Sequence, residues 1–213
     1  MGKISQGVLG GFSGKIGNVI GGSWKGIDYM RIKPASVANP RTEGQVDQRT
    51  KFTAALQFLQ PMRDFLKVGY KAYANKMTEF NSAMSYILNN AVTGISPDFA
   101  VDYASALISR GSLPGSLNAA VSSTAPGEVT VTWADNTLNG SASATDKSLI
   151  LLFNEGKLEA IFTLSGATRS AGTQALVVPD NYTGDQLQAF ISFQSADGSL
   201  VSNSTYIGSV LVA

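Results

Sequence analysis

The feature that most constrains the fold is a change of pattern near residue 96. Beyond it, short runs alternate apolar and polar side chains, and clusters of Gly, Asn, Asp and Ser separate them. Period-two alternation is typical of strands with one face on a core, and short strands at this spacing favour an antiparallel sandwich. We expect strands at residues 103–109, 117–123, 129–133, 148–153, 158–164, 174–178, 188–194 and 199–211.

One tryptophan indicates which kind of sandwich this is. The run from Val129 to Trp133 places Val129, Val131 and Trp133 on one face, with threonines on the other. A single core tryptophan on an early strand is typical of immunoglobulin-like and fibronectin-III-like sandwiches. The chain has no cysteine, which argues against an antibody-type domain and is neutral for the fibronectin type.

Residues 42–94 have the apolar spacing of helices. Thr42 and Gln45 have the spacing of a capping box, which predicts a helix start. Pro61 predicts a break with a second helix opening near it, because proline has no N–H and suits the first helical turn. A third helix is expected to begin near Thr78 and to stop at Gly94.

The first 34 residues are rich in glycine, with apolar residues between. Residues 27–33 alternate with period two, and Lys25-Gly26 has the character of a turn, so a β-hairpin is expected there. The expected fold class is therefore α+β: an N-terminal β-hairpin plus two or three helices, then an antiparallel immunoglobulin/fibronectin-III-like β-sandwich. We expect a basic, Gly-rich hairpin and helical region at 1–95 and an acidic sandwich domain at 96–213.

The net charge of +1 conceals a strong asymmetry along the chain. Residues 1–76 carry 12 bases and four acids, a net charge of +8, whereas residues 77–213 carry four bases and 11 acids, a net charge of −7. Two interpretations stay open. The basic half binds an anion such as nucleic acid, or it meets the acidic half of another copy in a head-to-tail contact.

The composition argues against an enzyme. Without histidine the chain lacks the usual general base near neutral pH and the commonest metal ligand, and without cysteine it has no thiolate site. Chemistry based on carboxylates or lysine alone stays open. We expect no catalytic residues, no metal and no cofactor.

Two further motifs have some features of ligand sites. Gly14-Lys15 suggests a phosphate loop, but Ile16 stands where Ser or Thr is required and no helical pattern follows. Asp135, Asp146 and Asp197 lie in loops of the expected sandwich and would form a Ca²⁺ site only if those loops converge.

The candidate binding residues all lie in the basic half. Cations with aromatic residues among them can contact phosphate and stack on bases, and they also suit a protein–protein contact. The partner- or nucleic-acid-binding candidates are Lys3, Lys15, Trp24, Lys25, Tyr29, Arg31, Lys33, Arg41, Arg49 and Lys51.

No stretch of the sequence has the length and apolarity of a membrane span. The N-terminus contains no continuous apolar run of the kind that a Sec signal peptide needs. A cytoplasmic or phage-virion location is therefore expected ahead of classical secretion.

The N-terminal residues carry a resemblance to a known family. The resemblance is carried by the stretch from Lys3 to Gly14, then Gly17 to Gly21 with Trp24-Lys25-Gly26, then Arg31 with Asn39-Pro40-Arg41-Thr42, Gln45 and Gln48-Arg49. Together these residues resemble an uncharacterised Bacteroidota family of unknown function. Its members are similar in length and run from a Gly-rich basic start through this helix start to a β-rich end. The resemblance implies a bacterial or phage source and transfers no functional residues.

Three functions are consistent with these features. The first is a structural or assembly protein of a virion, filament or surface array that self-associates as a homo-oligomer, or docks to other structural proteins, through its basic N-terminal half. The second is a nucleic-acid-binding module that uses the hairpin and first helix. The third is an adhesin-like sandwich that binds a glycan or a protein through its loops.

Overall fold

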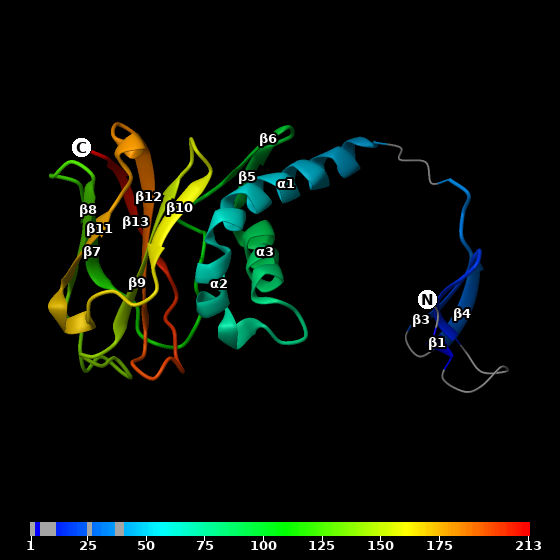
Figure 1. Cartoon of the computed structure of the whole chain (residues 1–213), viewed down its shortest axis with the longest axis horizontal. Coiled ribbons are helices and arrows are strands. Elements are labelled where there is room, and N and C mark those ends of the chain that lie inside the picture. The colour runs from blue at the N-terminus through cyan, green and yellow to red at the C-terminus, as the bar shows by residue number, and fades with distance from the viewer. Residues whose placement is uncertain (1–2, 5–11, 25–26, 37–40) are drawn as a thin grey trace. The chain divides into compact units, whose positions relative to one another are not determined.

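The computed structural model describes residues 3–4, 12–24, 27–36 and 41–213, and it contains two compact units (Figure 1). Unit 1 spans Met1–Thr42 and unit 2 spans Glu43–Ala213. This division differs from the boundary expected between residues 95 and 96. The reason is that the helices share a core with one sheet of the sandwich, so they belong to the same compact body.

Unit 1 is an antiparallel sheet with the strand order β1-β2-β3-β4. The strands are β1 (Lys3–Ile4), β2 (Phe12–Ile16), β3 (Val19–Trp24) and β4 (Ile27–Ile32). The expected hairpin is present as β3 and β4, and its turn at residues 25–26 lies outside the described residues. Strand β4 lies at one edge of the sheet.

The helices of unit 2 begin close to where the sequence predicts, and the end predicted for the third helix is the exception. Helix α1 (Glu43–Leu59) gives way at Pro61 to a short 3-10 turn and then to α2 (Arg63–Gly69). Helix α3 (Glu79–Asn90) starts after Thr78, whose hydroxyl oxygen accepts a hydrogen bond from the backbone N–H of Asn81. The exception is Gly94, which does not end α3 and instead lies in a strand with a φ of 104°.

That strand belongs to a hairpin that the sequence did not reveal. Strands β5 (Val92–Ile95) and β6 (Asp98–Val101) pair with each other and pack beside α1. The strand expected at residues 103–109 is absent. The segment begins instead with a turn, in which the Asp102 carboxylate accepts hydrogen bonds from the backbone N–H of Ala104 and the hydroxyl of Ser105.

The rest of unit 2 is the expected antiparallel β-sandwich. One sheet has the order β10-β9-β12-β13 and the other the order β11-β8-β7. The strands are β7 (Leu117–Ser122), β8 (Glu128–Ala134), β9 (Lys147–Asn154), β10 (Glu159–Thr163), β11 (Thr173–Val177), β12 (Gln186–Gln194) and β13 (Thr205–Leu211).

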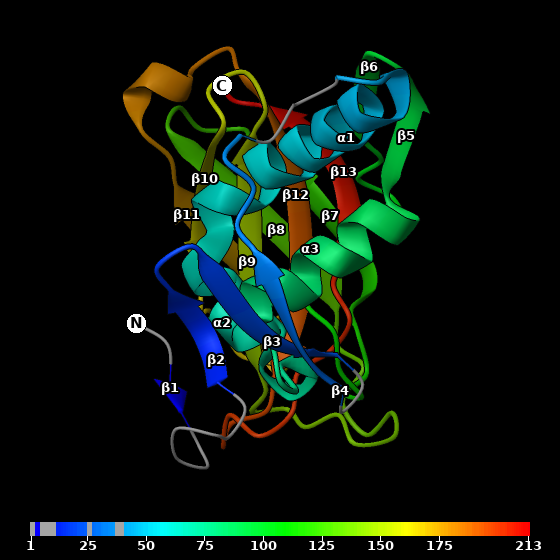
Figure 2. The ribbon, with the colours of Figure 1, turned by 90° about the vertical axis from the view of Figure 1, so that its right-hand side faces the viewer.

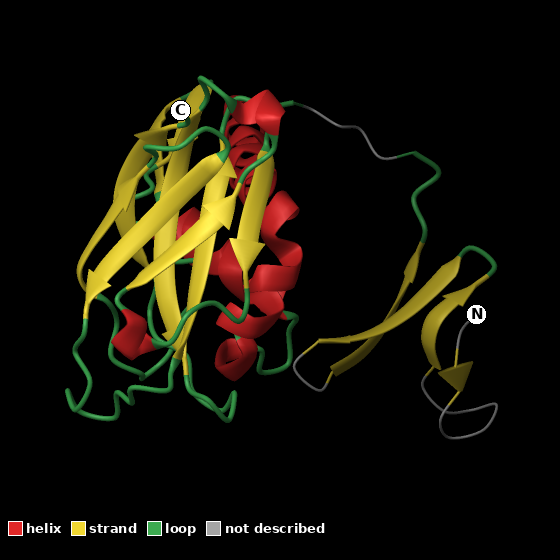
Figure 3. Ribbon diagram, turned by 60° about the vertical axis from the view of Figure 1, so that its left-hand side comes forward, coloured by secondary structure: helices red, strands yellow, loops and turns green. Residues whose placement is uncertain are grey.

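The β9–β12 sheet is buried on both faces, which makes unit 2 a three-layer structure. Leu149, Leu151 and Phe153 of β9 pack against the helices, whereas Ile150 and Leu152 pack against the β8 sheet. Figure 2 shows α1, α2 and α3 in front of β9 and β12, and Figure 3 shows the helices against one side of the strands. A strand covered on both faces reads as a continuous apolar run, as Leu149–Phe153 does.

Candidate docking surfaces

The sheet of unit 1 has two chemically different faces. Cross-strand partners in an antiparallel sheet project to the same side, so the pairing register assigns each residue to a face. Ile16, Val19 and Ile32 form one row, and Gly14, Gly21 and Met30 form the next. The ring of Phe12 lies against Gly21, where an added Cβ would approach it to 2.8 Å. The row of Ser23 and Asp28 follows on the same side, at one end of the sheet. We define Phe12, Ile16, Val19, Met30 and Ile32 as the apolar face.

The opposite side of the same sheet carries cations and an aromatic ring. Lys15, Ile20 and Arg31 form one cross-strand row, and Gly22 pairs with Tyr29 in the next. The Tyr29 ring lies over Gly22, since an added Cβ there would be 3.0 Å from its hydroxyl. Continuing the alternation along β4 adds Ile27 and Lys33. We define Lys15, Ile20, Ile27, Tyr29, Arg31 and Lys33 as the basic face.

The described residues of unit 1 form almost no core. Among its residues whose burial is described, Gly21 alone is buried, and every residue of β4 is exposed. On the apolar face Met30 is 71% exposed and Ile32 is 77% exposed. Isolated small sheets of this kind are marginal in water, so the exposed apolar rows make this face a candidate docking surface.

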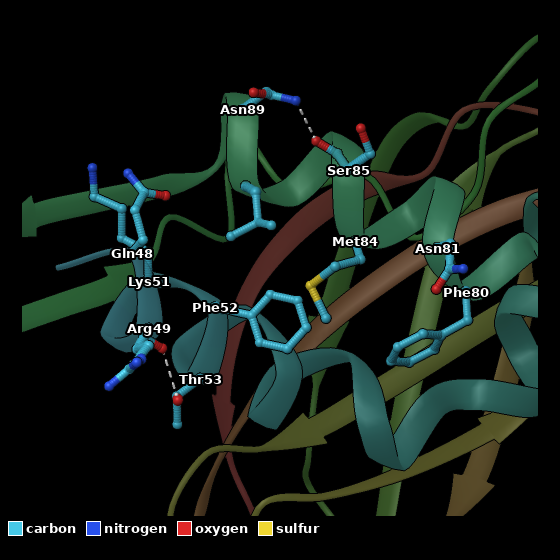
Figure 4. Close-up of a pocket in the computed structure, with 11 residues that line it drawn as sticks. Gln48, Arg49, Lys51, Phe52, Thr53, Phe80, Asn81, Met84, Ser85 and Asn89 are labelled. Carbon is cyan, nitrogen blue, oxygen red and sulfur yellow. Dashed lines mark hydrogen bonds between the residues drawn. The ribbon is translucent and has the colours of Figure 1, made fainter. Parts of the chain in front are cut away.

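A second surface lies in unit 2, in a groove of about 1100 Å³ between α1 and α3. Figure 4 shows Phe52, Phe80 and Met84 converging on it. The Phe52 side chain is 47% exposed, whereas the next aromatic of α1, Phe58, is buried. The remaining lining is amide, hydroxyl, aliphatic or cationic: Gln48, Arg49, Lys51, Thr53, Asn81, Ser85, Leu88 and Asn89.

The groove contains two of the ten candidate binding residues. Arg49 and Lys51 line it from α1, and the Lys51 ammonium nitrogen lies 4.9 Å from the centre of the Phe99 ring of β6. Lys15, Tyr29, Arg31 and Lys33 instead share the basic face of unit 1. The sequence-predicted cluster is therefore divided between two units.

The other candidates are placed less fully. Arg41 is exposed and has a φ of 37°. Lys3 and Trp24 lie in β1 and β3, but their side chains are outside what the structure describes, as is the whole of Lys25. For all ten residues a binding role stays a prediction.

The loop aspartates have local partners. The Asp146 carboxylate accepts from the Arg169 Nε at 3.0 Å, and the Asp135 carboxylate accepts from the backbone N–H of Thr137. Hydrogen bonds from Ser195 and Ser199 lower the pKa of Asp197 to about 2. Within the described ranges, no group of three or more acidic side chains is placed to hold a metal ion.

The described part of the chain contains no helix that combines the length and apolarity needed to cross a membrane.

The apolar face was missed by sequence reasoning, although part of its signal was visible. The alternation along residues 27–33 assigns Met30 and Ile32 to one side of a strand. Whether Met30 and Ile32 share a face with Ile16 and Val19 depends on the register of β2, β3 and β4, which the glycine-rich sequence does not specify strongly. The groove residues Phe80 and Met84 lie in the helix expected to begin near Thr78, and their place in a groove depends on how α1 and α3 pack.

Fold and surfaces together define an α+β protein with an immunoglobulin/fibronectin-III-like β-sandwich, whose helices cover one sheet of that sandwich. The chain belongs to a family of unknown function, DUF6266, whose family model matches residues 11–208.

Other comparisons add little beyond this. No curated protein matches the chain. Among solved structures, the fibronectin type III domain of the human collagen alpha-1(XX) chain is similar, at 12% sequence identity and a TM-score of 0.35. That match covers 47% of this chain and 86% of the collagen domain.

Proposed function

We propose that this protein is a non-enzymatic structural or assembly component, which self-associates or docks to other structural subunits through its basic N-terminal unit. The observation that carries the proposal is the sheet of unit 1, which has paired strands and an exposed apolar face, and whose described residues form almost no core. Such a sheet gains most of its stability when another surface covers it.

The edge of this sheet supports the same function. Strand β4 is six residues long, lies at the edge and is exposed along its whole length. An exposed apolar edge strand is a template for association, which folded proteins normally block or use. Arg31 and Lys33 limit pairing of β4 with the same strand of other copies, because like charges at an edge repel each other.

The charge distribution supports a specific contact. Unit 1 has six bases and one acid, a net charge of +5, and unit 2 has 10 bases and 14 acids, a net charge of −4. Opposite net charges steer association in a fixed orientation. We place the protein in a virion, filament or surface array, where subunits repeat such contacts.

Removing residues 1–42 is expected to abolish association, because the remaining unit keeps its own core and loses the proposed contact surface. The measurement is molar mass by light scattering for the full chain and for residues 43–213, at rising concentration and across a salt series. An assembly held by charge dissociates as salt rises, since the Debye length falls from about 10 Å at 0.1 M to about 3 Å at 1 M. A full chain that stays monomeric at high concentration and low salt would contradict the proposal.

A second candidate function, nucleic-acid binding, is favoured by the basic face. Lys15 and Arg31 flank Ile20 in one row, with Tyr29 in the neighbouring row. Cations beside an exposed aromatic ring provide phosphate contacts and a surface on which bases stack.

If this second function is correct, Arg31→Glu weakens binding of a labelled single-stranded oligonucleotide, because it removes one phosphate contact and adds a repulsive charge. The measurement is fluorescence anisotropy across a salt series, in which the slope of log K against log salt falls by roughly 0.7 for each lost contact. Lys67→Glu, the same charge change on exposed α2, is the control. Absence of binding at low salt to both single- and double-stranded nucleic acid would dismiss this function.

A further inference from the structure

We propose that unit 2 binds an acidic sugar, a small ring with one carboxylate and several hydroxyl groups, in a pocket beside Arg110. The pocket has a volume of about 550 Å³ and is lined by α3, by Tyr73 of the 3-10 turn after α2, and by Arg110. Its described lining residues all belong to unit 2, so the inference goes beyond the proposed function and does not depend on it.

The Arg110 guanidinium is held in place without using its hydrogen-bond donors. Its carbon lies 4.3 Å from the centre of the Tyr73 ring and 4.9 Å from that of Tyr86, and the Arg110 backbone N–H donates to the Gly69 carbonyl at 2.9 Å. In the part of the chain that the structure describes, the guanidinium forms no hydrogen bond and no ion pair. A positioned, partly buried guanidinium with free N–H groups suits a planar anion that accepts two parallel bonds.

The charge of the lining favours a carboxylate over a phosphate. Among the described residues that line the pocket, Arg110 is the one charged group. A carboxylate carries a single negative charge and matches the guanidinium with both oxygens. A phosphate monoester carries about −1.5 to −2 at pH 7, so one cation would leave part of its charge without a partner.

The amides of α3 favour a ligand rich in hydroxyl groups. The Asn89 amide nitrogen donates to the Ser85 carbonyl at 2.7 Å (Figure 4), and that of Asn90 donates to the Tyr86 carbonyl at 2.8 Å. These bonds orient both side chains and leave their amide oxygens as acceptors at the pocket. Sugar hydroxyls supply several donors to such acceptors, whereas a peptide backbone supplies one N–H per residue.

Apolar surface at the same pocket suits the C–H groups of a sugar ring. Tyr73 is 41% exposed and Met77 is 50% exposed, and both line the pocket. A ligand that combines a carboxylate, hydroxyl groups and an apolar ring face therefore matches each part of the lining. A uronic acid or a sialic acid has this combination.

Saturation-transfer NMR with the full chain tests the binding, because it observes the ligand and tolerates large assemblies. Glucuronate, galacturonate and N-acetylneuraminate are the acidic probes, and glucose and galactose are the neutral counterparts of the first two. At least one acidic probe is expected to bind, and its neutral counterpart about tenfold more weakly, because it lacks the charge-assisted bonds to Arg110. A hexose phosphate and a short peptide with a free C-terminal carboxylate test the other anions.

Two variants with matched controls assign the binding to this pocket. Arg110→Lys keeps the charge, loses the planar fork and is expected to weaken binding about tenfold. Its control is Arg63→Lys, since Arg63 lies over the Phe80 ring at 4.8 Å and is not among the residues that line this pocket. Asn90→Ala is expected to weaken binding about fivefold, with Asn81→Ala on the same helix as its control. Urea unfolding of each variant shows whether the fold is intact.

Several results would overturn the inference. They are equal binding of acidic and neutral sugars, no binding of any acidic sugar, and tighter binding of the phosphate or the peptide. Undiminished binding by Arg110→Lys, or an equal loss in Arg63→Lys, would also overturn it. If Arg110→Lys proves unfolded, Asn90→Ala against Asn81→Ala decides in the same way. None of these results bears on association through unit 1, which the removal of residues 1–42 tests separately.

Discussion

Replacing Arg169 by alanine is expected to lower the free energy of unfolding by about 3–5 kcal/mol, because it leaves the buried Asp146 carboxylate without its partner. The Arg169 side chain is 0% exposed. Its Nε donates to Asp146 at 3.0 Å, and one terminal nitrogen donates to the Asn136 side-chain oxygen at 2.6 Å. Few single substitutions in a domain of this size cost more.

The loss is large because Arg169 joins several loops of the sandwich. The guanidinium donates to the backbone carbonyl groups of Pro114 and Gly115, and it lies 3.9 Å from the centre of the Phe193 ring. The Arg169 carbonyl in turn accepts from the Trp133 indole N–H at 2.8 Å. Alanine keeps the backbone contact and removes every side-chain contact.

Urea denaturation gives the measurement, and an exposed ion pair gives the control. Lys67 and Asp64 form a contact of 2.8 Å with side chains 70% and 69% exposed, so Lys67→Ala is expected to change stability little. Asp146→Ala should destabilise as Arg169→Ala does, and the double variant should cost less than the sum of the two. Similar, small effects of Arg169→Ala and Lys67→Ala would show that the buried network contributes nothing.

The second large effect is expected at the interface between the helices and the sandwich. Phe58 of α1 is buried, and its ring contacts that of Phe153 edge-on at 5.2 Å and that of Phe190 at 6.1 Å. Phe58→Ala is expected to cost about 3–5 kcal/mol through lost burial and a residual cavity. Because helices and sandwich share this core, the whole of unit 2 should unfold earlier in one transition.

Trp133 reports that transition from the opposite layer. It lies on β8 in the second core, and Trp24→Phe makes it the only tryptophan of the chain. In this background, Phe58→Ala should lower the denaturation midpoint seen by Trp133 fluorescence and by far-UV circular dichroism equally. Phe52→Ala, on the same helix but half exposed in the groove, should have a much smaller effect. A Trp133 midpoint unmoved by Phe58→Ala would mean that helices and sandwich unfold independently.

Much of the fold followed from local pattern. Short apolar runs between turn residues predicted the seven strands of the sandwich together with a strand at residues 103–109 that is absent, and Trp133 indicated the type of sandwich. Pro61 and Thr78 marked the helix boundaries, since a missing N–H and a side-chain cap act within one turn. The β5–β6 hairpin was not predicted, because its short strands lie where a helix was expected to end.

Which residues share a candidate surface was harder to predict from the sequence than the fold was. Arg31 and Lys15 were predicted to bind a partner, and that role stays a prediction; their sharing of one face depends on strand register. Arg49 and Lys51 looked continuous with them along the chain and instead line a groove of unit 2. The change from a basic to an acidic sequence near residue 76 also does not coincide with the boundary between the two units at Thr42. The charge change is a property of the linear sequence, whereas the unit boundary depends on contacts in the folded chain.

The sequence by itself determined the α+β class, the antiparallel sandwich, the starts of the helices and the absence of histidine and cysteine. These depend on periodicity, caps and composition, which act within a few residues. Only the tertiary structure decided that the helices share a core with β9 and β12, and that unit 1 has one apolar and one basic face. Both depend on contacts between residues distant along the chain, and local pattern does not encode which buried surfaces meet.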